Sequence, residues 1–210
     1  MKSVDRFQSL LRIEKPLQIA GVINATCALL AAQAGFKALY LSGAGVANAD
    51  FGLPDVGLTA LCEVAEQLRR IVSVTDLPVL VDADTGWGDE PRAVARTIHV
   101  IEQAGAGGLH IEDQVWPKRC GHLSGKQVIS KAIMVDKIKA ALDSKKHAGF
   151  HVMIRTDALA VEGHAKTEDR LNAYVEAGAQ SIFIEAVSTL KDYHDWVKKI
   201  PVPVLANLTE

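Results

Sequence analysis

The chain has 210 residues, enough for one large domain or two small ones that bury about 70% of the unfolded surface. Its composition is 49% hydrophobic, 23% charged and 5% aromatic, which excludes disordered, collagen-like and disulfide-framework proteins. Lysine plus arginine (23) nearly balance aspartate plus glutamate (25), leaving a formal net charge of −2. This balance gives no electrostatic reason to bind nucleic acid or an anionic membrane, so we expect neither as a partner.

The cysteines and the N-terminus predict the cellular compartment of the protein. Cys27, Cys62 and Cys120 are too few, and odd in number, for a disulfide framework, and they indicate a reducing compartment. The first residues contain no apolar signal-peptide core, and no run reaches about 18 uncharged apolar residues. The sequence therefore predicts a cytoplasmic, globular protein.

Short apolar runs alternate with longer segments of helical period, which is typical of βα units around a parallel sheet. In the first half, strands are predicted at residues 17–23, 38–42 and 77–81. Helices are predicted at residues 26–34, 59–74 and 91–104. Pro91 near the start of the last helix and Gly105 after its end are ordinary helix boundaries.

The second half continues the same alternation. Strands are predicted at residues 108–112, 151–155, 181–185 and 202–206. Helices are predicted at residues 131–147 and 167–177, and a last one ends at residue 199. No low-complexity segment or linker interrupts the series, so residues 1–210 are predicted to form a single domain.

Polar residues follow nearly every predicted strand: Ser42, Asp82, Asp84, Glu112, Asp113, Arg155, Asp157, Glu185, Asn207 and Thr209. Active-site groups gather at the C-terminal strand ends of TIM-type (β/α)8 barrels, whereas a doubly wound sheet usually has a glycine-rich phosphate turn, which is absent here. Closing the barrel requires eight strands, and the sequence ends just after the seventh. We therefore predict an α/β protein with a TIM-type (β/α)8 barrel truncated after strand 7, its C-terminal strand and helices missing.

Asp82 and Asp84 stand two residues apart at a predicted strand end, so their side chains point the same way. Two convergent carboxylates suit a hard divalent cation, and Glu112 from the adjacent strand extends the anionic wall. Mg²⁺ takes one or two protein carboxylates and keeps several waters, which leaves room for a chelating substrate. The alternative is that one aspartate caps a loop and the other is only solvated. The pattern favours a Mg²⁺ site.

The segment Lys118-Arg119-Cys120-Gly121-His122 lies between the fourth strand and the next helix. Neighbouring cations favour the thiolate form of a cysteine, so Cys120 is predicted to be reactive. Gly121 and Gly125 are candidate hinges, and the mutual repulsion of the basic residues predicts a mobile lid that closes over an anion. The alternative is a basic surface loop with an incidental cysteine.

Three further features fit a small anionic substrate. Residues 42–45 (Ser-Gly-Ala-Gly) form a small-residue loop whose N–H groups could receive a carboxylate or phosphate, although tight turns use the same residues. Arg155 could bind a carboxylate bidentately, unless it is a structural arginine paired with Glu185 or Asp157. Tyr40 is either a core tyrosine or a proton-transfer group.

Several motifs carry a family resemblance: Tyr40-Leu41-Ser42-Gly43, Gly52-Leu53-Pro54-Asp55, Val81-Asp82-Ala83-Asp84, Gly108-Leu109-His110-Ile111-Glu112-Asp113-Gln114, Lys118-Arg119-Cys120-Gly121-His122, Arg155-Thr156-Asp157-Ala158 and Leu205-Ala206-Asn207-Leu208-Thr209-Glu210. With these motifs the chain resembles the isocitrate lyase/phosphoenolpyruvate mutase superfamily over its whole length. The Lys118–His122 loop resembles that of the lyase branch. Arg119, where isocitrate lyase itself typically has lysine, favours 2-methylisocitrate as the substrate.

The resemblance implies a set of site residues. It implies Mg²⁺, with Mn²⁺ as a substitute, held at Asp82 and Asp84, with Asp55, Glu112 and Lys118 around them. It implies Tyr40 as the base, Cys120 as the acid and His122 as a positive neighbour of the developing charge. The implied substrate contacts are Ser42, Gly43, Ala44, Cys120, Gly121, Arg155, Glu185, Asn207, Leu208 and Thr209. Ala44 departs from the glycine usual in the family.

The implied reaction is the retro-aldol cleavage of a small tricarboxylate, 2-methylisocitrate, into pyruvate and succinate. The family places this step in the methylcitrate cycle of propionate catabolism and assembles as a homotetramer. The alternatives are cleavage of isocitrate, a superfamily reaction on oxaloacetate or phosphoenolpyruvate, or an inactive truncated barrel that binds dicarboxylates. The sequence leaves the preference between methylisocitrate and isocitrate open.

Overall fold

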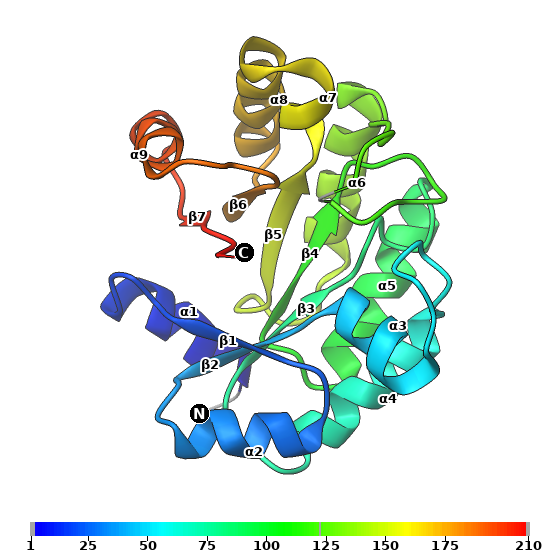
Figure 1. The fold of residues 1–210 in the computed structure, drawn as a ribbon, viewed down its shortest axis with the longest axis vertical. Helices are drawn as coiled ribbons and strands as arrows, with labels where there is room; N and C mark the ends of the chain where they lie inside the picture. Colours follow the sequence, from blue (N-terminus) through cyan, green and yellow to red (C-terminus); the bar gives the residue numbers. More distant parts are fainter. Residues whose placement is uncertain (1–2, 122, 209–210) are drawn as a thin grey trace.

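The structure is a computed structural model that describes residues 3–121 and 123–208 (Figure 1). In these residues seven parallel strands lie side by side in chain order, β1 to β7. Figure 1 shows that the sheet curls into a partial barrel with most of its helices on the outer side. The predicted α/β barrel with seven strands is confirmed.

The strands are β1 (Ile19–Val22), β2 (Ala38–Leu41), β3 (Val79–Asp82), β4 (Gly108–Glu112), β5 (His151–Thr156), β6 (Ser181–Ile184) and β7 (Val204–Leu205). The helices are α1 (Ser3–Ile13), α2 (Ala25–Gln33), α3 (Gly43–Phe51), α4 (Leu61–Val72), α5 (Pro91–Gln103), α6 (Lys131–Ser144), α7 (Ala158–Glu162), α8 (His164–Glu176) and α9 (Leu190–Lys199). None of the described helices is long and apolar enough to cross a membrane.

The predicted loop at residues 42–45 is the cap and first turn of a helix instead. Ser42 caps α3, because its side-chain oxygen accepts a hydrogen bond from the N–H of Gly45 at 3.1 Å. This bond satisfies one of the N–H groups that the first helical turn leaves unpaired. Gly52 ends the helix in the left-handed conformation, at a φ of 63°. The loop prediction was therefore wrong, although the residues do lie at a strand end.

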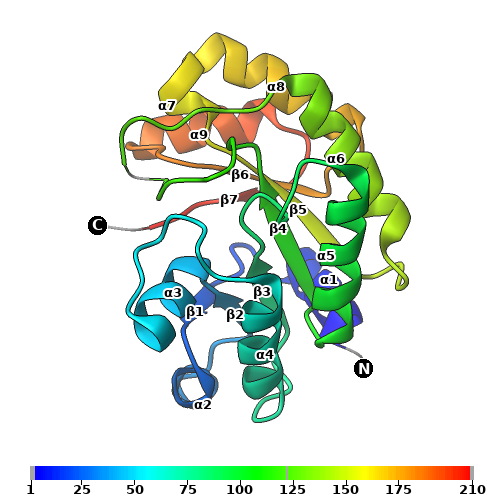
Figure 2. The ribbon, with the colours of Figure 1, turned by 90° about the vertical axis from the view of Figure 1, so that its right-hand side faces the viewer.

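Side chains alternate along each strand between two hydrophobic layers. On β3, Val79 and Val81 belong to the large core between the sheet and the outer helices, whereas Leu80 belongs to a smaller inner cluster. The buried members of the inner cluster are Phe7, Ala38, Leu80, Met153 and Phe183. Phe7 comes from α1, which Figure 2 shows on the opposite side of the strands from α3 and the loop after β4. Helix α1 therefore closes the N-terminal end of the barrel interior.

The strand register continues the inner face toward the C-terminal end. Asp82 pairs with His110 across β3 and β4, and Glu112 pairs with Arg155 across β4 and β5. These four residues follow the inner positions of their strands, so their side chains collect above the inner apolar cluster. The fold thus places polar groups where the sequence predicts a site.

Candidate active site

Asp82 ends β3 and Asp84 follows two residues later, and backbone N–H groups hold the Asp82 carboxylate. The Asp82 carboxylate accepts hydrogen bonds from the N–H of Gly43 and from the N–H of Asp84, each at 3.1 Å. Asp84 has a left-handed backbone, at a φ of 44°, which is uncommon for a residue other than glycine. Both aspartates are buried. The first turn of α3 therefore orients one aspartate, and a strained turn orients the other.

The two aspartates differ in how readily they ionise. Burial opposes ionisation of Asp82, but His110 and Lys118 outweigh it and hold the pKa of Asp82 below its ordinary value. At Asp84, burial and the negative charge of Asp82 raise the pKa above its ordinary value in spite of Lys118. A divalent cation beside both carboxylates would remove this repulsion.

Lys118 joins the loop after β4 to the aspartates. Its ammonium lies against the carboxylate of Asp55 and 2.7 Å from Oδ1 of Asp84, and its side chain is 4% exposed. Burial opposes the charge, but Asp84 and Asp82 outweigh it and raise the pKa of Lys118. The loop is docked in this structure, because its lysine pairs with carboxylates instead of facing other cations, and its predicted mobility stays a prediction.

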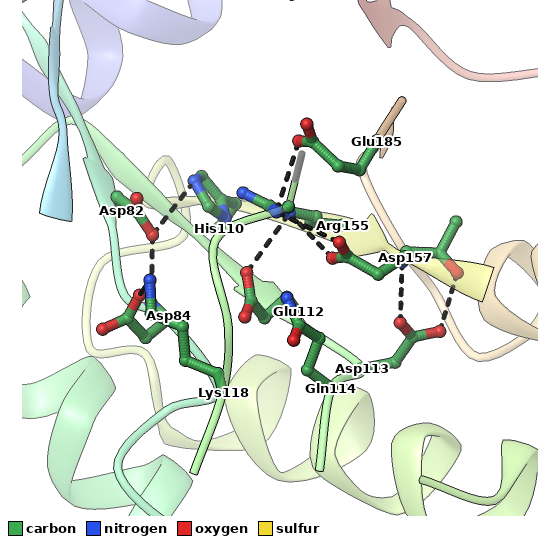
Figure 3. A network of polar contacts seen from close by, with 12 residues as sticks. Asp82, Asp84, His110, Glu112, Asp113, Gln114, Lys118, Arg155, Asp157 and Glu185 are labelled. Carbon is green, nitrogen blue, oxygen red and sulfur yellow. Dashed lines mark hydrogen bonds and ion pairs between the residues drawn. The ribbon is translucent and has the colours of Figure 1, made fainter. Parts of the chain in front are cut away.

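Arg155 lies at the centre of a second group of carboxylates (Figure 3). Its Nε is 3.0 Å from Asp157 and 3.2 Å from Glu112, and its Nη2 is 3.3 Å from Glu185. Burial opposes the charge, but these carboxylates outweigh it and raise the pKa of Arg155. Burial in turn raises the pKa of Glu112. Both predicted structural pairs, with Asp157 and Glu185, are present, so a substrate carboxylate would share the guanidinium with them.

Tyr40 and His110 form a hydrogen-bonded pair beside Asp82. The Tyr40 hydroxyl lies 2.8 Å from Nε2 of His110, and the rings are stacked with their centroids 5.7 Å apart. Burial lowers the pKa of His110 to about 4, so the imidazole is neutral at neutral pH. Burial and Asp82 raise the pKa of Tyr40, so this residue is a neutral phenol in the structure. As a base, it would need a further positive charge.

The structure brings together only some of the predicted substrate contacts. Gly121 packs against Arg155 and Glu185, which places its neighbour Cys120 beside this group. The backbone carbonyl of Ala44 accepts a hydrogen bond within α3. Asn207 follows β7, and its carbonyl accepts from Tyr193 at 3.2 Å, while Leu208 is 81% exposed. His122 and Thr209 lie outside the described residues.

Asn207 and Leu208 make none of the polar contacts of the cluster in the part of the chain that the structure describes. The predicted role of these two residues in substrate binding stays a prediction. The same holds for Ser42 and Gly43, whose polar atoms already serve the helix cap and Asp82.

The carboxylate oxygens of this site are suitable ligands for Mg²⁺. Among the described residues, six carboxyl groups surround three basic side chains: Asp55, Asp82, Asp84, Glu112, Asp157 and Glu185 around Lys118, Lys126 and Arg155. Both carboxyl oxygens of Glu112 are buried without a hydrogen-bond donor among those residues. No three histidine, cysteine or carboxylate side chains of the described chain converge on one point. Mg²⁺ needs only one or two carboxylates besides water, so Asp82 and Asp84 could hold it.

Sequence reasoning missed two residues of this site as individual candidates, His110 and Lys126. His110 stands two positions before Glu112 on β4, so the alternation of the strand could have placed it on the inner face. Lys126 is buried, with its ammonium 2.8 Å from Asp157. No local pattern marks it, because its partner is 31 residues away.

A parallel α/β barrel with buried carboxylates, a lysine-bearing loop and an arginine at the C-terminal strand ends has the arrangement of an enzyme active site. Residues 7–210 match the family described as phosphoenolpyruvate phosphomutase, and the chain belongs to this family. It is 52% identical over 204 residues to the 2-methylisocitrate lyase of Escherichia coli (strain K12), covering 97% of this chain and 69% of that protein.

Solved structures agree with this placement. The crystal structure of 2,3-dimethylmalate lyase, a member of the PEP mutase/isocitrate lyase superfamily, matches with a TM-score of 0.94 at 32% identity, over 100% of this chain and 71% of that one. Phosphonopyruvate hydrolase in complex with oxalate and Mg²⁺ matches with a TM-score of 0.85 at 28% identity, over 97% and 71% of the two chains. The superfamily resemblance inferred from the sequence is confirmed.

Proposed function

We propose that this chain is a carbon–carbon lyase that cleaves 2-methylisocitrate into pyruvate and succinate with Mg²⁺. The observation that carries this proposal is the docking of the Lys118–Gly121 segment, with Cys120 in it, between the aspartates of β3 and the Arg155 group. The relatives at about half identity that bear the name of this lyase support it. The mutase and hydrolase structures are more distant, at 28–32% identity.

The end of the site at Asp82 and Asp84 would receive the hydroxyl-bearing part of the substrate. Bound Mg²⁺ would supply Lewis-acid stabilisation of negative charge on the substrate oxygens. Asp82 and Asp84 would hold it, and Mn²⁺ would serve in its place. Tyr40, hydrogen-bonded to His110, would take the hydroxyl proton, because a positive charge nearby favours the phenolate that burial and Asp82 disfavour.

The end of the site at Arg155 would complete the cleavage. Breaking the carbon–carbon bond leaves a carbanion beside the carboxylate that becomes part of succinate. Arg155, with His122 and Asn207, would stabilise this charge, and Cys120 would donate the proton that completes succinate. The docked loop would exclude water, so that the protonation occurs only from the thiol.

The test is a product assay with four acids. The protein is incubated with Mg²⁺ and, separately, 2-methylisocitrate, isocitrate, oxaloacetate and phosphoenolpyruvate, and the products are identified by NMR. Pyruvate and succinate from 2-methylisocitrate, at a kcat/KM above that for isocitrate, are expected. Turnover of oxaloacetate or phosphoenolpyruvate alone would replace the proposal with another reaction of the superfamily. A control with EDTA tests the metal requirement.

We further propose a homotetramer in the cytoplasm that serves propionate catabolism through the methylcitrate cycle. The three cysteines are free thiols in the structure, as a reducing compartment requires. Light scattering coupled to size-exclusion chromatography tests the assembly, and a mass near that of one chain would contradict it.

A further inference from the structure

Gln114 holds the backbone on the N-terminal side of Cys120. Its side chain, buried just after β4, donates from Nε2 to the carbonyl of Arg119 at 2.9 Å and accepts at Oε1 from the N–H of Arg119 at 3.0 Å. One planar amide thus satisfies both backbone groups of a single loop residue. A primary amide carries a donor and an acceptor side by side, which an ionised carboxylate does not.

Lys126 holds the backbone on the C-terminal side of Cys120. Its ammonium donates to the carbonyl of Gly121 and to Oδ1 of Asp157, and its side chain is 3% exposed. Asp157 also binds Arg155, so the loop and the arginine share one carboxylate. A buried ammonium is costly to leave unpaired, and its ion pair with Asp157 joins the loop to the barrel.

The loop can dock closely because residue 121 is glycine. A Cβ added there would collide with Nη2 of Arg155 and lie 2.6 Å from Cγ of Glu185. The carbonyl of Cys120 accepts from the N–H of Leu123 at 2.9 Å. The backbone of Arg119 and the backbone of Gly121, on either side of Cys120, are therefore both fastened by buried side chains, and the thiol is carried between them.

We propose, on the basis of the lyase function proposed above, that Gln114 and Lys126 are positioning residues that fasten the backbone of Arg119 and Gly121, the neighbours of Cys120 on either side, and so place its thiol for proton donation. Neither residue needs to touch the substrate. Their effect is geometric, since a misplacement of about 1 Å can cost on the order of a hundredfold in rate.

The test uses Gln114→Glu and Lys126→Met, with matched controls nearby at the exposed Gln127 (Gln127→Glu) and the half-buried Lys131 (Lys131→Met). Gln114→Glu preserves shape but sets a carboxylate oxygen against the carbonyl of Arg119. The first measurement is the rate of alkylation of Cys120 by iodoacetamide, read by peptide mass spectrometry and divided by the rate at the exposed Cys62 of the same molecule. The second is kcat and KM for 2-methylisocitrate.

Both variants are expected to raise the Cys120/Cys62 alkylation ratio at least about fivefold and to lower kcat at least about tenfold, with KM changed less than about threefold. The controls should match the wild type. An unchanged ratio, or a raised ratio with unchanged kcat, would overturn the proposal. If Lys126→Met fails to fold, Gln114→Glu decides. If the wild type turns over none of the acids while the ratio still rises, the lyase function fails and the fastening of Cys120 stands on the alkylation data.

Discussion

The two ends of the barrel interior differ in chemistry although the same strands build both. At the N-terminal end Phe7 is fully buried in an apolar cluster, and a polar residue beside it, His151, is uncharged at neutral pH, with its Nε2 2.7 Å from Oγ of Ser181. Toward the C-terminal ends of the strands, the same inner face carries charged side chains such as Asp82 and Arg155. One end is filled and neutral, and the other is crowded with ions.

The contrast shows where the fold can tolerate unfavourable groups. Burying an ion costs several kcal/mol, and pairing recovers this cost only in part. The raised pKa values of Asp84 and Glu112 reflect this cost, since burial makes ionisation of both carboxyl groups less favourable than in water. The apolar N-terminal end therefore stabilises the barrel. The barrel in turn holds the charged groups of the C-terminal end in position. Each prediction below changes one end and measures both stability and function.

The largest effect is expected from Cys120→Ser at the charged end. Loss of a general acid typically lowers turnover by about 10²–10⁴-fold. The free energy of unfolding should change by less than about 0.5 kcal/mol, because Cys120 is part of a loop and not of either core cluster. Pyruvate release measures the turnover, and Cys62→Ser is the matched control. Undiminished turnover would remove Cys120 from the mechanism.

The neutral end is tested by Phe7→Ala. Deleting a fully buried phenylalanine should lower the free energy of unfolding by about 3–5 kcal/mol. Phe51→Ala removes a side chain that is 45% exposed, and it should cost less than about 1 kcal/mol. Urea denaturation measures both. Folded Phe7→Ala protein should retain its kcat, and a kcat that falls in proportion to stability would refute the division between the two ends.

The sequence predicts the strands well because they are short apolar runs between helices of clear period. The prediction at 108–112 coincides with β4, and the other six overlap the observed strands. Helix α3 was missed because its sequence, with two glycines in the first turn, has weak helix propensity. It forms because Ser42 caps it and Val46 and Ala47 pack into the structure, which is a tertiary effect.

Half of the candidate site follows from the alternation of strands and half does not. The shared face of Asp82 and Asp84 is visible at a spacing of two. The partners of the loop are not, because Lys118 meets Asp55 from 63 residues away. The prediction of a mobile lid started from repulsion between the loop cations, whereas the fold pairs Lys118 with carboxylates that the sequence reasoning did not place beside it. Contacts made at long sequence separation are set by packing and not by local pattern.

A smaller effect is expected from the pH dependence of the neutral end. Burial, together with the charge of Lys145, lowers the pKa of His151 to about 4, against about 6.5 in an unfolded chain. The unfolded state therefore binds the proton first as the pH falls, so stability present above pH 6.5 is lost progressively toward pH 4. The loss from this group between about pH 7.5 and pH 5 is about 2 kcal/mol.

The substitution His151→Gln should remove the contribution of His151 to the pH dependence of the free energy of unfolding. Urea denaturation at the two pH values measures it, with the exposed His194→Gln as the matched control. The variant should lose about 2 kcal/mol less than the wild type on acidification. An equal loss in variant and wild type would show that His151 is not the group that titrates.

The smallest effect, with the opposite sign, is expected from Asp84→Asn at the charged end. The folded pKa of Asp84 lies above the unfolded value, so the folded state is favoured while the group is protonated and this advantage disappears as the pH rises through the folded pKa. At neutral pH in EDTA, removing the charge should therefore stabilise the protein by on the order of 1 kcal/mol, even though one partner of Lys118 is lost, because Asp55 remains.

Added Mg²⁺ should reverse the order of stability of the wild type and Asp84→Asn. A ligand that binds only the folded state stabilises it in proportion to the logarithm of its concentration over Kd. The wild type should gain stability in Mg²⁺ and Asp84→Asn should gain little, while Asp50→Asn, at an exposed position, should follow the wild type in both buffers. Urea denaturation with EDTA and with Mg²⁺ measures all three. A variant that is less stable than the wild type in EDTA, or that gains equally from Mg²⁺, would contradict the view that this end of the barrel holds unfavourable charge for the sake of a cation.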